Sequence, residues 1–406
     1  MPAAPLTRAE CESLDAADPL AAFAAKFALP EGVLYLDGNS LGALPAVTAA
    51  HVAHVIEEEW GRGLITSWAG ARWWERPQLL GDRLSPLLGA APGQVVLGDS
   101  TSVDLFKVLV AALGLRPGRS VVISDSGNFP TDLYLLRSVA ALVGAIEVRL
   151  IERDEQALAA ALDDDVAAVL LTHVDYRSAE MLDMGKVTAA VHGAGALMIW
   201  DLCHSAGAVP LALDDCEVDL AVGCTYKYLN GGPGSPAFIY AAARHLPHLD
   251  QPLAGWGGHA RPFDFEATFE PAEGIGRFNS GTPQILSLSA LEASLAIFEQ
   301  VDLPELWHKR EALSGLLIAL VAERCGERLA LASPPEPARR GSHVAYRHPH
   351  ARELQVALAA RGVLGDFRPP DLLRLGLAPL YLSHCNVFDA VEILAEVLDE
   401  QGAVLG

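Results

Sequence analysis

One stretch, residues 225–236 with the sequence TYKYLNGGPGSP, constrains the fold of this chain more than any other. It follows an apolar run at 218–224 and precedes another at 237–241, so Lys227 lies between two predicted buried strands. Lysine is rarely buried without a partner, and burial favours the neutral amine that attacks a carbonyl group. Two interpretations remain open: a Schiff-base lysine beneath a cofactor, or a hairpin whose lysine extends to water.

The composition predicts a globular protein with one large and one smaller core. The 406 residues are 51% hydrophobic and 20% charged, and the formal net charge is -22. This negative charge argues against a nucleic-acid partner, because proteins that bind phosphate backbones concentrate positive charge. An anionic ligand would therefore need a local cluster of cations.

The sequence shows no targeting, membrane or metal-binding signal. Residues 1–10 contain prolines and charges without the apolar core of a signal peptide, and no apolar stretch is long enough to span a bilayer. The six cysteines are scattered without a CxxC pair, so we expect neither a disulfide framework nor a metal site. The default expectation is a cytoplasmic protein with no membrane partner.

From residue 95 onward, short apolar strands alternate with helices. The predicted elements are strands at 95–97, 121–124, 167–172 and 197–200 and helices at 103–113 and 133–143. Strands separated by helices pair in parallel, with helices on both faces of the sheet. Polar residues then collect at the carboxyl ends of the strands, where open α/β sheets bind ligands.

The flanking segments predict an N-terminal arm and a second domain. An Ala-rich helix is predicted at 16–28, and the last helix of the chain is predicted to begin at residue 388. A long helix is predicted at 285–301 and the composition changes after it, so the smaller domain is predicted to start near residue 282. The predicted division is an N-terminal segment 1–45, a large α/β domain 46–281 and a smaller α+β domain 282–406.

Several features at the predicted strand ends suit pyridoxal phosphate. Asp201 ends the strand before Lys227, and the hydroxyls of Thr101 and Ser102 open a helix. The aromatic Phe129 heads another strand-end loop. The cofactor requires a lysine for its aldehyde, a carboxylate at its pyridinium nitrogen, a ring to stack on and a phosphate cup. Each residue alone has an ordinary explanation as a cap or turn, but together they favour this cofactor.

Longer motifs carry a resemblance to a known family. They are YLDGNSLG at 35–42, NFPTD at 128–132, WDLCHSAG at 200–207, TYKYLN at 225–230, GWGGH at 255–259, and Arg374 with APLY at 378–381. On these motifs the chain resembles the kynureninases, pyridoxal-phosphate enzymes of the aspartate aminotransferase fold (fold type I), from about residue 34 to residue 385. The resemblance implies a mainly parallel sheet covered by helices on both faces, plus a smaller α+β C-terminal domain.

The resemblance also implies a role for individual residues at the cofactor. Lys227 would bind the aldehyde and move the α-proton, and Asp201, supported by His204, would hold the pyridinium N–H. The implied catalytic residues are Lys227, Tyr226, Asp201 and Asp132. The implied cofactor-binding residues are Thr101, Ser102, Phe129, Pro130, Thr131, Asp132, Thr172, Asp201, His204, Tyr226 and Lys227, with Trp256 and Thr282 reaching across from the second subunit of a homodimer.

For the substrate, the resemblance implies that Arg374 binds an α-carboxylate as a bidentate pair, with Asn39 and Ser40 nearby. The implied reaction is hydrolysis of L-kynurenine to anthranilate and L-alanine in tryptophan degradation, a route connected to NAD biosynthesis. Water adds to the γ-carbonyl, the β–γ bond breaks, and Tyr226 is a candidate to deliver a late proton. 3-Hydroxykynurenine is a second candidate substrate.

Two alternatives stay open. The first is another fold type I enzyme, such as a cysteine desulfurase or an aminotransferase. A desulfurase needs a mobile cysteine, whereas Cys325 lies at a predicted helix end, and desulfurases usually have histidine at the position of Tyr226. The second is a pyridoxal-phosphate-binding protein without catalysis, which the presence of Lys227, Asp201 and Arg374 disfavours.

Overall fold

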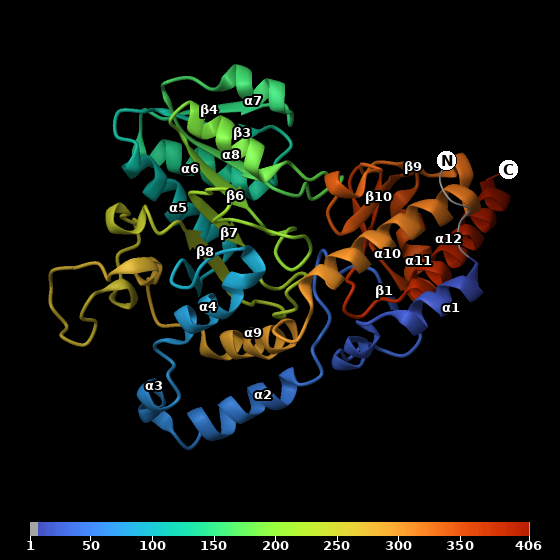
Figure 1. Cartoon of the computed structure of the whole chain (residues 1–406), viewed down its shortest axis with the longest axis horizontal. Helices are drawn as coiled ribbons and strands as arrows, with labels where there is room; N and C mark the ends of the chain where they lie inside the picture. The colour runs from blue at the N-terminus through green and yellow to red at the C-terminus, as the bar shows by residue number, and fades with distance from the viewer. Residues whose placement is uncertain (1–6, 406) are drawn as a thin grey trace.

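A seven-stranded sheet forms the centre of the larger lobe in the computed structural model, which describes residues 7–405 (Figure 1). The strand order is β2-β8-β7-β6-β5-β3-β4. The strands are β2 Val95–Gly98, β3 Val121–Asp125, β4 Glu147–Ile151, β5 Val166–Thr172, β6 Leu197–Asp201, β7 Leu220–Gly223 and β8 Ala237–Ala241. Five of them, from β7 to β4, pair in parallel, and β8 is antiparallel to both of its neighbours. The predicted mainly parallel sheet is confirmed.

Helices cover both faces of this sheet because the strand residues point alternately to the two sides. On one face, helices α5 (Thr101–Leu115) and α6 (Pro130–Val143) pack on Leu170 and Ile199. On the other, α8 (Met184–Gly193) packs on Trp200, together with α4 (Arg76–Leu88), α7 (Glu155–Ala161) and α9 (Ile285–Phe298). Each strand is therefore buried from two sides, and its carboxyl end is fixed.

A second, smaller sheet organises the other lobe. Its antiparallel order is β12-β13-β10-β9. The elements are β9 Ala330–Leu331, β10 His343–Arg347, β12 Asp366–Arg368 and β13 Leu372–Gly376, with helices α10 Leu303–Arg324, α11 Ala351–Ala360 and α12 His384–Leu405. The N-terminal segment joins this lobe, since α1 (Arg8–Ala17) packs on α12 and β1 (Leu34–Tyr35) pairs with β11 (Val363–Leu364) (Figure 1).

The remaining helices and turns lie in the N-terminal segment, in either lobe or between the lobes. They are α2 Thr48–His54, α3 Ser67–Gly70, a π-helical turn Val55–Trp60 and short 3-10 turns at Ala21–Lys26, Leu64–Thr66, Leu246–His248, Trp256–Gly258, Gly274–Phe278, Gly326–Arg328 and Pro337–Arg339. Helix α9 packs against α4 and α2.

Four local expectations were wrong or incomplete. The first helix begins at Arg8 instead of residue 16, because Thr7 and Glu10 form a capping box there. The last begins at His384 instead of residue 388, because the Asp15 carboxylate accepts from the N–H groups of His384 and Cys385. Strand β4 and helix α7 were not predicted, since β4 is a half-exposed edge strand without a continuous apolar run.

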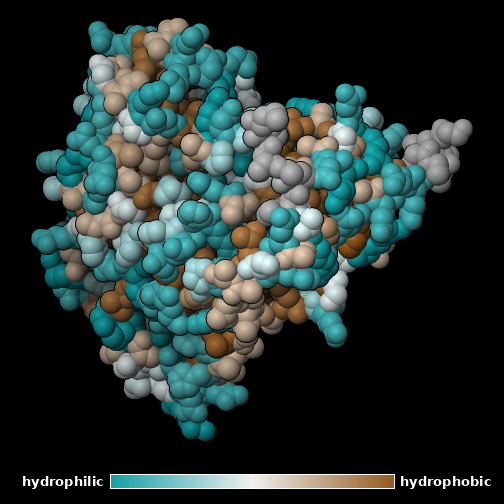
Figure 2. Space-filling model, turned by 45° about the vertical axis from the view of Figure 1, so that its right-hand side comes forward, coloured by the Kyte–Doolittle hydropathy of each residue, from teal (hydrophilic) through white to brown (hydrophobic). Residues whose placement is uncertain are grey.

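Hydrophilic side chains predominate over the face of the molecule shown in Figure 2, as expected for a chain with 51 acidic residues. Within residues 7–405, no helix combines the length and the apolar character required to cross a membrane. The part of the N-terminal prediction that concerns residues 1–6 lies outside the described residues.

Candidate active site

Lys227 lies in the connection between the antiparallel neighbours β7 and β8, at the carboxyl end of β7. The motif at 35–42 closes over this connection. Gly42 donates its N–H to the Tyr226 carbonyl over 2.8 Å. A Cβ atom at Gly42 would lie only 2.2 Å from the Lys227 carbonyl oxygen, so this close approach of two backbones requires glycine. The N-terminal segment thereby fixes the lysine loop.

The Lys227 amine has a histidine partner. Its Nζ lies 2.9 Å from His204 Nε2 and 5.7 Å from the centroid of the Tyr226 ring. Burial lowers the pKa of His204 well below its usual value, and the charge of Lys227 acts in the same direction. His204 is therefore a neutral imidazole, and its Nδ1 is buried without a partner among the described residues. His204 therefore contacts Lys227, whereas the resemblance implied that it supports Asp201. Asp201 accepts a hydrogen bond from the backbone N–H of Cys203.

Two carboxyl groups meet at the ends of β6 and α6. Asp201 ends β6 and accepts the N–H of Cys203 over 2.8 Å, and the Thr172 hydroxyl lies 3.4 Å from its second oxygen. Asp132, in the first turn of α6, has a pKa well above its usual value because of burial and, next, because of the charge of Asp201. Its Oδ2 is buried without a partner in the described part of the chain. The raised pKa of Asp132 favours its protonated form beside Asp201.

The amino end of α5 supplies hydroxyl and N–H groups. Ser100 caps the helix by accepting the Val103 N–H, and the Thr101 hydroxyl lies 3.7 Å from Cys203 Sγ, which places it beside Asp201. Just before the cap, the backbone of Asp99 has a positive φ of 44°. The buried Lys107 amine donates to the Asp99 carboxylate and to the Phe278 carbonyl, both over 2.6 Å, and so holds this turn.

An aromatic ring stands at the start of α6. Phe129 precedes Pro130 and Thr131, the first two residues of that helix. Its ring meets Tyr176 edge to face, with centroids 5.2 Å apart and an interplanar angle of 88°. The side chain is 41% exposed, so the ring is available for stacking.

Arg374 enters the site from the smaller lobe. It is fully buried on β13, directly opposite Asp366 of β12, and its Nε and Nη2 donate to the two Asp366 oxygens over 2.7 and 2.5 Å. Nη2 also reaches the Ser40 hydroxyl at 3.2 Å, and Nη1 donates to the Tyr176 carbonyl of the larger lobe. Asn39 is buried, and neither of its amide atoms has a partner in the described residues. Arg374, Ser40 and Asn39 are therefore brought together.

Two of the predicted cofactor residues lie on the surface. Trp256 is 38% exposed and packs on Trp74 and Phe263, with centroids 4.7 and 5.9 Å away, and Thr282 is exposed. Their loops pack on each other through a hydrogen bond from the Gly257 N–H to the Ser280 carbonyl. No described contact joins Trp256 or Thr282 to Lys227 of the same chain.

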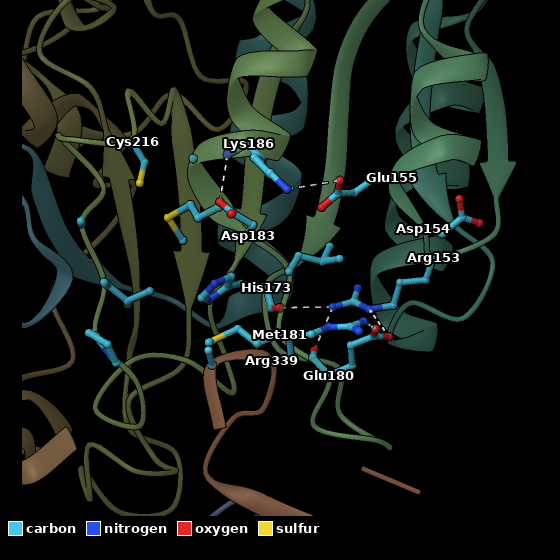
Figure 3. Close-up of a pocket in the computed structure, with 17 residues that line it drawn as sticks. Arg153, Asp154, Glu155, His173, Glu180, Met181, Asp183, Lys186, Cys216 and Arg339 are labelled. Carbon is cyan, nitrogen blue, oxygen red and sulfur yellow. Dashed lines mark hydrogen bonds and ion pairs between the residues drawn. The ribbon is translucent and has the colours of Figure 1, made fainter. Parts of the chain in front are cut away.

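A large pocket lies away from these residues. A cleft of about 740 Å³ opens between the amino ends of α7 and α8 and residues 338–339 of the smaller lobe (Figure 3). Arg153, which lines it, donates to the carbonyls of His173 and Glu180, and Lys186 lies 3.9 Å from Glu155. The charged side chains that line this cleft mostly pair with one another or with backbone carbonyls. The size of the cleft therefore does not by itself identify it as the active site.

Sequence reasoning missed several residues of the site. Asp366, Tyr176 and Asp37 all touch or surround Arg374. The only available signal was the alternation of Asp366 and Arg368 in a short strand, which places both on one face. For Tyr176 there was no signal beyond its position after a strand end.

The residues fit pyridoxal phosphate. An amine, a carboxylate pair with an unpartnered oxygen, a hydroxyl-bearing helix start and an accessible aromatic ring gather at one edge of the sheet. Within the described residues, no group of three or more His, Cys, Asp or Glu side chains is placed to hold a metal ion.

Comparisons with known proteins give the family. Residues 306–394 match the model of the kynureninase C-terminal domain. The chain is 50% identical to a kynureninase of Burkholderia pseudomallei, covering 97% of this chain and 96% of that protein, and 48% identical to one of Pseudomonas fluorescens with the same coverage.

Among solved structures, the fold is similar to that of the cysteine desulfurase CsdA from Escherichia coli, with a TM-score of 0.80 over 94% of this chain and 98% of that one, at 17% identity. It is also similar to a C-DES mutant with glycine linked to its PLP cofactor, with a TM-score of 0.79 over 90% and 97% of the two chains, at 17% identity. The chain belongs to the kynureninase family, whose members are pyridoxal-phosphate enzymes of fold type I.

Proposed function

We propose that this enzyme hydrolyses L-kynurenine to anthranilate and L-alanine, and that 3-hydroxykynurenine is a second candidate substrate. The observation that carries the proposal is the meeting of Lys227, the Asp132–Asp201 pair and Arg374 at one site in a chain of this family. An amine, an acidic pair and a guanidinium suit an α-amino acid whose carboxylate must be held while its α-carbon reacts.

Bound pyridoxal phosphate supplies the electron sink that makes bonds at the α-carbon labile. The protein supplies charge and proton positions. Lys227 Nζ carries the α-proton, and neutral His204 Nε2 can accept its hydrogen bond. Asp201 would hold the ring nitrogen, next to Asp132, whose raised pKa favours its protonated form. Burial raises the pKa of Tyr226, so its phenol stays protonated and can donate a proton after the carbon–carbon bond breaks.

The remaining site residues are assigned by their positions. Thr101, Ser102 and Tyr226 would hold the phosphate, Phe129 would stack on the ring at the start of the helix that continues with Pro130 and Thr131, and Thr172 would support Asp201. Asn39 and Ser40 would contact the substrate beside Arg374. Asp366 accepts from Nε and Nη2 of Arg374, so the substrate carboxylate would bind at the end of the guanidinium, where it would take the place of the Ser40 hydroxyl and the Tyr176 carbonyl.

We also propose a division of the chain into three parts. We assign residues 1–45 to an N-terminal segment, 46–281 to the cofactor domain and 282–406 to the smaller domain, although α9 (Ile285–Phe298) packs on α4 and α2 of the larger lobe. A cytoplasmic enzyme of tryptophan degradation, on the route to NAD biosynthesis, is the cellular role that this reaction supports.

The direct test is product analysis. The purified protein with added cofactor should convert L-kynurenine to anthranilate and alanine in equal amounts, which fluorescence and amino-acid analysis would quantify. A parallel assay of 3-hydroxykynurenine measures the preference. Release of sulfide from cysteine, or amino transfer to a 2-oxo acid, without anthranilate would favour the desulfurase or aminotransferase alternative.

We also propose a homodimer whose active sites are shared. A loop protrudes from the larger lobe (Figure 1, yellow). Phe263 and Phe265 are exposed in this part of the chain, and the Phe263 ring packs on Trp256. Exposed apolar clusters of this kind are typical of protein interfaces. A second copy covering this surface would receive Trp256 and Thr282 at its own cofactor.

Mixing two inactive variants tests the shared site. Lys227→Ala and the double variant Trp256→Ala/Thr282→Ala should each be nearly inactive alone. If the sites are shared, random mixed dimers restore about a quarter of the native sites, because one site of each heterodimer keeps both native halves. No restoration, with mixed dimers confirmed by mass spectrometry, would place Trp256 and Thr282 in the site of their own chain.

A further inference from the structure

Four charged side chains surround the proposed carboxylate site. Arg374 and Arg368 are positive, and Asp366 and Asp37 are negative. Asp366 is bonded to both cations, since Arg368 Nη2 lies 2.9 Å from the oxygen that also accepts from Arg374. Burial alone would raise the pKa of Asp366, but the hydrogen bonds and charge of Arg374 outweigh it and the pKa is lowered. Asp366 is therefore the permanent counter-ion of this cluster.

Asp37 differs from Asp366 in its partners. It follows β1 in the YLDGNSLG motif, and its Oδ1 is buried without a hydrogen bond inside the described structure. No ion pair within residues 7–400 includes it, although Arg374 and Arg368 are near enough to act on its charge. Burial raises the pKa of Asp37 to about 6, and the charge of Asp366 acts in the same direction, while Ser40, Arg374 and Arg368 act against both.

The other titratable groups facing Asp37 are tyrosines. Tyr35 lies on β1, Tyr228 in the lysine loop and Tyr381 after β13. Burial raises the pKa of each of them, to about 12 for Tyr35, so all three stay neutral between pH 6 and 9. His204 and His343, which Arg374 also influences, have pKa values lowered by burial, to about 3 for His343, so they stay neutral as well. Asp37 is thus the described group beside Arg374 whose pKa lies near neutral pH.

A substrate carboxylate changes the charge balance. With Asp37 ionised, the cluster has two positive and two negative charges, and the carboxylate adds a third negative charge. Like charges in a buried site raise each other's pKa, and Asp366 cannot accept the proton because both arginines stabilise its ionised form. The Ser40 hydroxyl links Asp366 to Arg374, since it donates to Asp366 over 3.1 Å and accepts from Arg374.

We propose that Asp37 takes up a proton from solvent when the substrate carboxylate binds to Arg374. The inference rests on the proposed function, because it takes Arg374 as the carboxylate-binding residue. The proton binds Asp37 and no covalent bond breaks, so the site returns to neutrality with the carboxylate in place. Asp37 is in this sense a positioning residue: once protonated, it no longer repels the bound anion.

Proton uptake by Asp37 makes the affinity for the carboxylate depend on pH. Above the pKa of free Asp37, about 6, binding requires a proton from solvent, so affinity for the carboxylate should fall by up to about tenfold for each pH unit of increase. Below pH 6 Asp37 is already protonated, and this dependence should disappear. The Asp37→Asn variant, which is neutral throughout, should bind the carboxylate with little change between pH 6 and 8.

Calorimetry tests the inference without turnover. The probe is 4-(2-aminophenyl)-4-oxobutanoate, which has the kynurenine skeleton and carboxylate but lacks the amine that would condense with the cofactor. Titrating it into the holoenzyme at pH 7, in buffers of different ionisation enthalpy, gives the number of protons exchanged. We expect uptake of roughly half to nine tenths of a proton per site. Uptake near zero is expected for Asp37→Asn and for the amide of the probe.

Each outcome has a distinct meaning. Equal uptake by the native protein and a folded Asp37→Asn variant would assign the proton to another group and overturn the inference. Kynurenine turnover with no proton uptake by the native protein would overturn the inference and leave the proposed function intact. A probe that does not bind, in a protein that makes no anthranilate, would overturn the proposed function and the inference with it.

Discussion

The Lys227→Ala variant is expected to lose at least about a thousandfold in kcat and to show no cofactor linked to the protein after borohydride reduction. The effect is expected to be large because the proposed function gives the Lys227 amine two tasks, covalent attachment of the aldehyde and transfer of the α-proton. Its Nζ faces His204 at 2.9 Å, and His204 is held neutral by burial, so the histidine cannot replace its charge. Peptide mapping of the reduced native protein should find the label on Lys227 alone.

Two other lysines provide the controls. Lys186, which is exposed beside the large pocket, should be replaceable by alanine without loss of turnover or label. Lys107 is buried beside the turn proposed to bind phosphate, but its amine is already bonded to Asp99 and to the Phe278 carbonyl, so it should stay unlabelled. A label on Lys107, or full activity of Lys227→Ala, would contradict the central assignment.

The site residues that could be predicted are those whose place in the fold follows from the pattern of their immediate neighbours in the sequence. Asp201 and Lys227 follow apolar strands, and parallel strands present their carboxyl ends at one edge, so local pattern and topology together brought them into one site. Arg374 could be predicted on similar grounds, because its leucine neighbours on β13 belong to the core.

What could not be predicted depends on distant pairing. Asp366 becomes the partner of Arg374 only when β12 and β13 align in antiparallel register, and the alternation of Asp366 and Arg368 does not specify that register. Asp15 also acts from far away in the sequence. It caps α12 from the opposite end of the chain, so that helix begins earlier than predicted. Capping by a distant residue leaves no local signal.

Protonation states form a second class of information beyond the sequence. Asp132 is an aspartate at a helix start like many others, yet its pKa is raised well above the usual value because the carboxyl is buried and lies near the charge of Asp201. Hydrogen bonding also separates Asp37 from Asp366: burial raises the pKa of both acids, but the hydrogen bonds and charge of Arg374 outweigh burial at Asp366 and lower its pKa. Such differences arise from tertiary packing, so they require the structure.

The second large effect is expected at Arg374. The Arg374→Leu variant should lose roughly 30-fold to several thousandfold in kcat/KM for kynurenine, because truncating one member of a buried charge pair costs about 2 to 5 kcal/mol. The guanidinium is fully buried, and its loss would also leave Asp366 with Arg368 as its single cationic partner. A fall in activity alone would therefore not separate carboxylate binding from support of the fold.

The substrate analogue separates the two roles. An amide of kynurenine should be poor with the native enzyme and hardly worse with Arg374→Leu, because the amide has no charge for Arg374 to bind. Arg340→Leu is the matched control: Arg340 is equally buried but donates to the carbonyls of Pro334 and Pro335, so its loss should lower stability and penalise acid and amide alike. If Arg374→Leu also penalises acid and amide equally, Arg374 supports the junction of the lobes through Tyr176 and Asp366, and the carboxylate is bound elsewhere.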